Sequence, residues 1–241
     1  LEHLGGARAS ADAEVVAIAA ECLEALGVRD GVVALGHVGV FNALADVAGA
    51  DPATRPALRE RVDAKDASGV AALLAGSVAA AGVKEALAGL TSLAGDVSVL
   101  ERAAEAVRAV PAAASAVEEL RVLAGSLVEA GLGGRVSIDL GEVRALDYYT
   151  GLVFRIFAPG LGFEIGSGGR YDGLLARFGR PLPAVGFMLG LDRVALLLDR
   201  QGAVPGAPAA PAEAVGTLAA ARARRQAGAR VRFAASGREG R

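Results

Sequence analysis

The stretch that decides the fold spans residues 135–200 and reads RVSIDLGEVRALDYYTGLVFRIFAPGLGFEIGSGGRYDGLLARFGRPLPAVGFMLGLDRVALLLDR. It holds all three tyrosines of the chain, Tyr148, Tyr149 and Tyr171, and five of its seven phenylalanines. A buried tyrosine needs a partner for its hydroxyl group. Aromatic side chains gathered beside arginines and glycines therefore predict a binding pocket in this part of the chain.

Three pieces of this stretch have clear local patterns. Residues 138–157 alternate and are rich in Val, Ile, Tyr and Phe, which predicts two antiparallel strands. In residues 166–174 (GSGGRYDGL) the glycines allow the backbone to approach a ligand, and Tyr171 is expected to open a short helix. Residues 184–198 predict a strand, a glycine turn and a helix that begins near Gly190. Arg193 falls in the first turn of that helix, where an anionic ligand would offset its unfavourable interaction with the helix dipole.

The same pieces resemble the catalytic core of histidyl-tRNA synthetases. VRALDYYTG (143–151) and SGGRYDGL (167–174) are similar to the two histidine-specific motifs of that family, and AVGFMLGLDR (184–193) is similar to the third class II motif, with Asp192 where Glu is usual. The segments IDLGEVR and YYTGLVFRIFAPG resemble more closely the regulatory subunits of ATP phosphoribosyltransferase, which are non-aminoacylating paralogues of the synthetases. The resemblance implies an α+β fold, with a class II synthetase-like antiparallel sheet flanked by helices.

The chain is expected to divide into three parts. Residues 1–38 and 134–200 form the synthetase-like core, whose N-terminal part, with the first class II motif, the resemblance places outside this sequence. Residues 39–133 form a helical insertion, either a partner surface or a scaffold without a partner, and residues 201–241 form a Pro/Gly/Ala linker and a short, partial C-terminal α/β piece. We expect helices at residues 11–26 (with Ser10 as cap), 39–49, 53–63, 66–75, 83–93, 97–109, 112–130 and 213–227, and further strands at 1–4, 32–36 and 230–235.

The resemblance also implies a set of site residues. The positions that match the histidine pocket are Glu2, Arg144, Tyr149, Tyr171, Gly186 and Gly190, and Arg193 matches a residue beside ATP, so it is a candidate for binding an anion or phosphate. A guanidinium group suits carboxylate and phosphate because its planar fork matches their geometry.

Several of these residues also admit a purely structural interpretation. Glu2 can be an edge-strand carboxylate, and Tyr148 is expected to pack while Tyr149 faces the ligand. Asp147 and Asp172 are expected to brace Arg144, Arg170 and nearby backbone, and Arg170 itself is expected to be structural. Cys22 fits a helical core stripe, and His37 a strand-end residue that bonds backbone.

Composition excludes several classes of function. The net charge is −2 and the mean hydropathy is +0.43, without an unbroken apolar run of membrane-spanning length. One cysteine and two distant histidines predict neither disulfides nor a metal site, and they fit a reducing cytoplasm. No nucleophile–base pair is evident, so we expect no catalytic residue and no cofactor.

The sequence therefore predicts a regulatory, non-catalytic subunit. The resemblance implies that the short catalytic subunit of ATP phosphoribosyltransferase is its partner and that histidine is its effector. It also implies a homodimer within a hetero-oligomer, in the cytoplasm, without membrane or tRNA binding. Two alternatives remain open: a fragment of a histidyl-tRNA synthetase core, and an RNA-binding module that uses the arginine-rich tail.

Overall fold

A seven-stranded mixed sheet forms the centre of the computed structural model, which describes residues 1–241 apart from 29, 144–147, 202–212, 230 and 234–241. The strand order is β1-β7-β6-β5-β2-β4-β3, and every neighbouring pair is antiparallel except β2 and β4, which are parallel. The strands are β1 (Glu2–Leu4), β2 (Val32–His37), β3 (Ala94–Gly95), β4 (Val136–Asp139), β5 (Leu152–Phe157), β6 (Gly166–Arg170) and β7 (Ala184–Leu189). This architecture confirms the expected α+β class.

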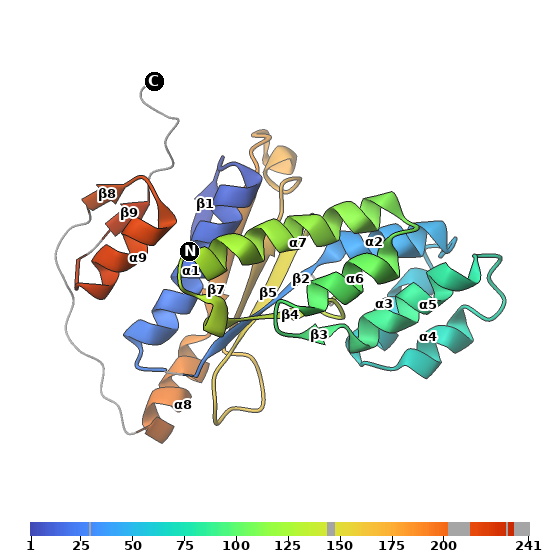
Figure 1. Cartoon of the computed structure of the whole chain (residues 1–241), viewed down its shortest axis with the longest axis horizontal. Coiled ribbons are helices and arrows are strands. Elements are labelled where there is room, and N and C mark those ends of the chain that lie inside the picture. Colours follow the sequence, from blue (N-terminus) through green and yellow to red (C-terminus); the bar gives the residue numbers. More distant parts are fainter. Residues whose placement is uncertain (29, 144–147, 202–212, 230, 234–241) are drawn as a thin grey trace.

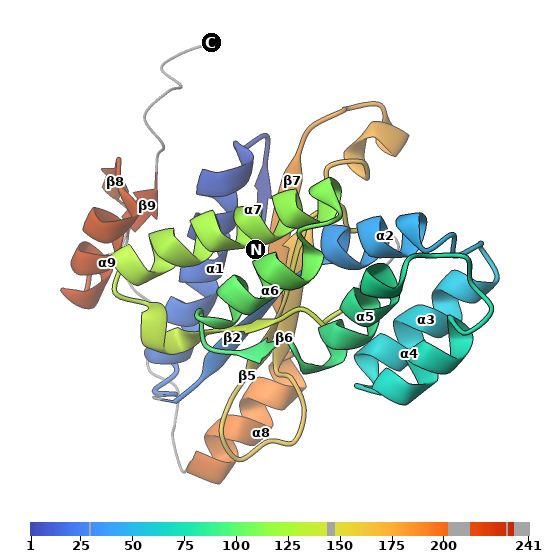
Figure 2. The same cartoon turned by 45° about the vertical axis from the view of Figure 1, so that its right-hand side comes forward.

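Helices cover one face of the sheet and gather beyond its end (Figure 1). Helix α1 (Arg8–Ala25) packs on β7 and β2, and α7 (Pro111–Glu129) packs on α1 and β2. Helices α2 (Val38–Val47), α3 (Thr54–Asp63), α4 (Ala67–Leu73), α5 (Ala81–Gly89) and α6 (Val99–Val107) form a group at one end of the molecule (Figures 1 and 2). Helix α8 (Leu191–Gln201) follows β7 directly. None of the helices within the described ranges has the length and apolar character needed to cross a bilayer.

The helices expected between residues 39 and 133 are confirmed to within a few residues, but this segment also supplies a strand. β3 lies between the helices expected at 83–93 and 97–109 and pairs with β4 at the edge of the sheet, where no strand was expected. Its last helix, α7, lies in the layer that covers the sheet, next to α1. The boundaries of the insertion at 39 and 133 remain a prediction.

The glycine-rich segment expected to approach a ligand is a central strand of the sheet. A Cβ atom at Gly168 would lie 2.5 Å from Cζ of Phe154 and 2.6 Å from Cβ of Phe187, so a side chain there would disrupt this packing. The rings of Phe154 and Phe187 are 6.3 Å apart in the core. The helix expected to open at Tyr171 is a 3-10 turn at Leu175–Phe178 instead.

Three other expectations are corrected. The two strands expected within 138–157 are β4 and β5, and they run antiparallel but are not neighbours, because β2 lies between them. Helix α1 begins at Arg8, before Ser10, and the Ser10 hydroxyl donates to the Ala7 carbonyl at 3.3 Å instead of capping the helix. The tail contains two parallel strands, β8 (Glu213–Val215) and β9 (Val231–Phe233), around α9 (Leu218–Gln226), where one strand was expected.

Candidate functional site

The three tyrosines form one cluster, which we call the tyrosine site together with Glu2, Gly169 and Gly186. The ring centroids of Tyr148 and Tyr149 are 4.9 Å apart, those of Tyr148 and Tyr171 are 5.7 Å apart, and those of Tyr149 and Tyr171 are 6.3 Å apart. These separations are typical of interacting aromatic pairs. Tyr148 and Tyr149 precede β5, whereas Tyr171 follows β6, so two neighbouring strands bring the rings together.

Glycines on adjacent strands form the floor of this site. Glu2 is paired with Gly186 on β7, which is paired with Gly169 on β6, so all three residues face the same side of the sheet. A Cβ atom at Gly169 would lie 2.6 Å from Cε1 of Tyr149, and one at Gly186 would collide with the carboxylate of Glu2. The absent side chains therefore let the Tyr149 ring and the Glu2 carboxylate lie directly on the sheet.

Burial shapes the electrostatics of the two polar groups at this floor. It raises the pKa of the Tyr149 hydroxyl well above its usual value, and the neighbouring Tyr148 and the carboxylate of Glu2 raise it further. Burial also raises the pKa of Glu2. A partly desolvated carboxylate beside aromatic rings favours a ligand that supplies an N–H group or a positive charge. The site is thus suited to binding a small nitrogen-containing molecule.

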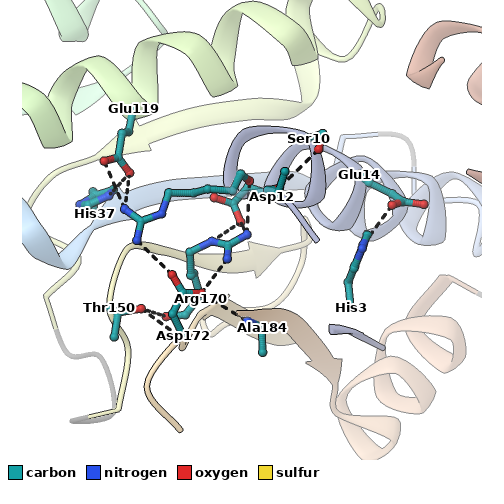
Figure 3. Close-up of polar contacts among 12 residues, drawn as sticks. His3, Ser10, Asp12, Glu14, His37, Glu119, Thr150, Arg170, Asp172 and Ala184 are labelled. Carbon is teal, nitrogen blue, oxygen red and sulfur yellow. Dashed lines mark hydrogen bonds and ion pairs between the residues drawn. The ribbon is translucent and has the colours of Figure 1, made fainter. Parts of the chain in front are cut away.

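A buried arginine braces the backbone around the tyrosines (Figure 3). Arg170 is 1% exposed; its Nε donates to Oδ1 of Asp12 at 2.8 Å and its Nη1 donates to Oδ1 of Asp172 at 2.7 Å. Asp172 also accepts from the backbone N–H of Ala184 at 3.2 Å, and its own N–H donates to Oγ1 of Thr150 at 3.0 Å. Because Thr150 follows Tyr149 and Asp172 follows Tyr171, this arrangement fixes both tyrosines. The structural roles predicted for Arg170 and Asp172 are confirmed, whereas Asp147 lies outside the described residues.

The bracing continues to helix α7 through Arg8. The Arg8 guanidinium donates to Oδ2 of Asp172 and to Oε2 of Glu119, each at 3.0 Å. Oε2 of Glu119 also lies 3.3 Å from Nε2 of His37, whose Nδ1 accepts from the Gly39 N–H at 3.1 Å. The predicted backbone bond of His37 is confirmed. The hydrogen bonds and charges of His37 and Arg8 lower the pKa of Glu119 to about 2, against the opposing effect of burial.

The sequence did not reveal the roles of Arg8, Asp12 and Glu119 in this bracing. The Asp12 side chain faces the sheet and is 9% exposed. Burial raises its pKa, and the hydrogen bond from Arg170 opposes that rise. The sequence signal that could have revealed this role is the position of Asp12 among the apolar residues of a core helix, because a buried carboxylate requires a cation as its partner.

Two of the predicted residues lie away from the tyrosine site. Gly190 is four residues beyond Gly186, or about 13 Å along the chain, and its N–H donates to the Ile165 carbonyl at 2.8 Å. Arg193 is in the first turn of α8, as expected, but its Nη1 donates to Oε1 of Glu164 at 2.7 Å and to the Glu164 carbonyl at 2.6 Å. Its guanidinium carbon also lies 5.5 Å from the centre of the Phe163 ring. Anion binding by Arg193 therefore stays a prediction, and it requires competition with Glu164.

The structure thus brings together Glu2, Tyr149, Tyr171 and Gly186 of the predicted histidine-binding set. Arg144 lies outside the described residues, so its place in the set is untested. Across the part of the chain that the structure describes, no three His, Cys, Asp or Glu side chains converge as metal ligands. His3 is instead paired with Glu14, 3.1 Å from Nδ1 to Oε2, on the opposite face of the sheet.

A largely antiparallel sheet of this order, with its site between strand-end tyrosines and an edge-strand carboxylate, defines a class II synthetase-like core. The family model described as histidyl-tRNA synthetase matches residues 1–194, and the chain belongs to that family. The sequence-based recognition of this superfamily is confirmed.

Several relatives within the family are named as regulatory subunits. The ATP phosphoribosyltransferase regulatory subunit of Anaeromyxobacter sp. (strain Fw109-5) is 42% identical over 215 residues, which cover 88% of this chain and 61% of that protein. A crystal structure from Bacillus halodurans C, described as an ATP phosphoribosyltransferase regulatory subunit/histidyl-tRNA synthetase, has a TM-score of 0.72 and 30% identity, and the match covers 98% of this chain and 62% of that one. The HisG:HisZ ATP phosphoribosyl transferase complex of Thermotoga maritima contains a chain with a TM-score of 0.54 and 20% identity (78% and 63% covered), which supports the fold alone. The first of the curated relatives are matched over 57% of their length.

Proposed function

We propose that this chain is part of a regulatory, non-catalytic subunit of ATP phosphoribosyltransferase, acting with a short catalytic subunit at the first step of histidine biosynthesis. One observation carries the proposal: relatives 35–42% identical over at least 83% of this chain are named as that regulatory subunit. A homodimer within the hetero-oligomer and a cytoplasmic location are parts of the same proposal.

Histidine is the proposed ligand of the tyrosine site. Glu2 supplies an acceptor for an N–H group of the imidazole or for the ammonium group, and Tyr149 and Tyr171 line the ring. Gly169 and Gly186 let the Tyr149 ring and the Glu2 carboxylate lie directly on the sheet, so a flat ligand would bind above these two groups. Histidine inhibits the complex only if it binds two states of that complex with different affinity.

The test combines assembly with inhibition. The protein, produced in its natural full-length context, is mixed with the short catalytic subunit, and complex formation and phosphoribosyl transfer are measured with and without histidine. We expect a stable complex, a rate that needs both proteins, and inhibition by histidine. Tyr149→Ala should weaken inhibition at least about tenfold while the complex persists, because a lost aromatic contact and cavity cost more than about 1.4 kcal/mol. The exposed-residue variant Glu105→Gln is the matched control. Absence of a complex, or a rate indifferent to histidine, would refute the proposal.

A second candidate is the catalytic core of a histidyl-tRNA synthetase. The observation that favours it is the family model itself, together with the dual description of the structure from Bacillus halodurans C. This candidate requires Arg193 to leave Glu164 and meet ATP. Histidine-dependent exchange of pyrophosphate into ATP by the protein alone would support it and would argue against a purely regulatory role.

A further inference from the structure

The turn at residues 139–143 connects β4 to the segment that ends in the tyrosines, and it is packed between the sheet and the helical group. Its Leu140 N–H donates to the Leu93 carbonyl at 3.0 Å, which ties it to the chain before β3. On the other side, a Cβ atom at Gly36 of β2 would lie 2.8 Å from the Asp139 carbonyl oxygen. The turn therefore rests directly on the β2 backbone, with no space between them.

Three charged side chains from three elements meet beside this turn. Arg155 of β5 bonds Glu142 of the turn through two nitrogens, Nη2 to Oε1 at 2.8 Å and Nε to Oε2 at 2.6 Å. The same Nη2 donates to Oδ1 of Asp63, the last residue of α3, at 3.3 Å. The side chains of Glu142 and Asp63 are each 11% exposed. Arg155 thus joins the turn and α3 to the sheet.

Burial and the neighbouring charges give the Glu142 carboxyl an unusual pKa. Burial, together with the carboxylates of Asp63 and Asp139, raises the pKa of Glu142 to about 7 against the opposing effect of Arg155. Lys65 neutralises Asp139, because its Nζ donates to Oδ1 of Asp139 at 2.5 Å. Two carboxylates and two cations therefore surround Glu142 from α3, β4 and β5.

Lys65 stands in a backbone conformation that favours glycine. Its φ is +58°, and it has the only positive φ of a non-glycine residue among those that the structure describes. The Lys65 N–H donates to the Val62 carbonyl and the Asp66 N–H donates to the Arg61 carbonyl, the bonds of a Schellman motif that ends α3. Glycine would suit this backbone conformation better than lysine. What lysine adds at position 65 is the contact of its side chain with Asp139.

We infer that Asp63 and Lys65 are positioning residues for the tyrosine site: from the end of α3, Asp63 contacts Arg155 of β5, the strand that Tyr148 and Tyr149 precede, and Lys65 holds Asp139 at the start of the 139–143 turn. This inference rests on the proposed function for its ligand, histidine, but not for its geometry. The end of α3 thereby becomes the point through which the helical group and the histidine site influence each other.

The chain offers an internal optical reporter of this coupling. It has three tyrosines and no tryptophan, and all three tyrosines belong to the tyrosine site. Near-ultraviolet circular dichroism of the tyrosine band therefore reports the arrangement of this cluster, with or without histidine.

The test compares four variants of the protein with wild type. Asp63→Asn combined with Lys65→Gly removes both charges that the end of α3 brings to this cluster while easing its backbone, and Lys65→Arg keeps the positive charge. Asp63→Asn alone separates the two contacts, and Glu60→Gln changes an exposed carboxylate on the same helix as a matched control. Thermal unfolding verifies that each variant is folded, and calorimetry measures the dissociation constant for histidine.

We expect the double variant to change the tyrosine signal and to bind histidine about 5- to 20-fold more weakly, within the range of couplings between sites. Asp63→Asn should give a smaller effect of the same sign, whereas Lys65→Arg and Glu60→Gln should resemble wild type. A folded double variant with unchanged tyrosine signal and unchanged affinity would overturn the inference. If wild type does not bind histidine, the proposed ligand is wrong, and the tyrosine signal alone still decides whether α3 positions the site.

Discussion

Replacement of Arg170 by methionine tests the bracing of the tyrosine site most directly. The change removes a guanidinium that is 1% exposed and leaves a side chain of similar length in its place. Asp12, whose side chain is 9% exposed, loses the cation 2.7 Å from its Oδ1. Asp172 keeps Arg8 as a second partner at 3.0 Å and is 27% exposed, so most of the cost falls on Asp12.

The magnitude follows from the burial of Asp12. Removing one partner of a buried ion pair costs about 3–5 kcal/mol, because the other charge stays desolvated. Protonation of Asp12 limits this cost to about 1.4 kcal/mol for each pH unit by which the pH exceeds the unfolded-state pKa of aspartate, about 3.9, and hence to about 4 kcal/mol at pH 7. We therefore expect a loss of about 3 kcal/mol at pH 7, which corresponds to about 6–12 °C in Tm for a chain of this length.

Urea unfolding followed by far-ultraviolet circular dichroism measures the effect. Burial already raises the pKa of Asp12 above its unfolded value, and the loss of Arg170 raises it further. A carboxyl group whose pKa is raised in the folded state destabilises the protein increasingly as the pH rises from its unfolded pKa to its folded pKa. The stability difference between the variant and wild type should therefore shrink when the pH is lowered from 7 to 5. Asp12→Leu combined with Arg170→Met should recover much of the stability, because no buried charge is left. A loss below about 1 kcal/mol, or an equal loss at both pH values, would refute the reasoning.

Four further outcomes are expected. Gly125→Ala, in the exposed middle of α7 with open space around it, should stabilise the protein by about 0.5–1 kcal/mol in urea unfolding. Gly186→Ala should displace the edge strand β1 and abolish histidine binding in calorimetry, whereas the fold persists in far-ultraviolet circular dichroism. Tyr149→Phe should remove from a spectrophotometric titration a tyrosine step that lies above the usual tyrosine pKa, since burial raises the pKa of Tyr149. Glu119→Gln should destabilise the protein above pH 4.5, where the wild-type carboxylate contributes fully, and the difference should vanish as pH falls through about 2; acid titration of stability measures this.

Local signals predicted much of the secondary structure. The strand, glycine and helix of residues 184–198 appear as β7, Gly190 and α8, because each depends on periodicity and on a turn residue within the same short segment. The helices between residues 39 and 133 were equally readable from their apolar spacing. Helix α1 shows the limit of such signals: Ser10 is a good cap by type, yet α1 begins at Arg8.

Long-range arrangement was not readable from the residues alone. Nothing within residues 138–157 indicates that β2 separates β4 from β5, since that order depends on a strand from a distant part of the chain. Glycines in residues 166–170 predicted an approach to a ligand, but Gly168 is required by the packing of Phe154 and Phe187 within the core. A glycine indicates close contact without specifying its partner.

The candidate site was likewise predicted only in part from the sequence. Glu2, Tyr149, Tyr171 and Gly186 were named through resemblance, and sheet register brings them together. The pairing of Arg193 with Glu164 was not foreseeable, because the carboxylate comes from the chain before β6, outside every motif. Charges that neutralise each other across elements leave no periodic trace in a sequence.

The parallel pairing of β2 with β4 has a consequence for how the protein folds. Val33 and Val136 are partners, and the whole of α2 to α7 is synthesised between them. The entropic cost of closing a loop rises with its length, so contacts within α2 to α7, which shorten the effective loop, should form before β4 meets β2. During synthesis on the ribosome, β2 therefore waits with both edges unpaired until the helices have collapsed, because its other neighbour, β5, is synthesised after β4. This interval is the one in which the nascent chain is most exposed to aggregation.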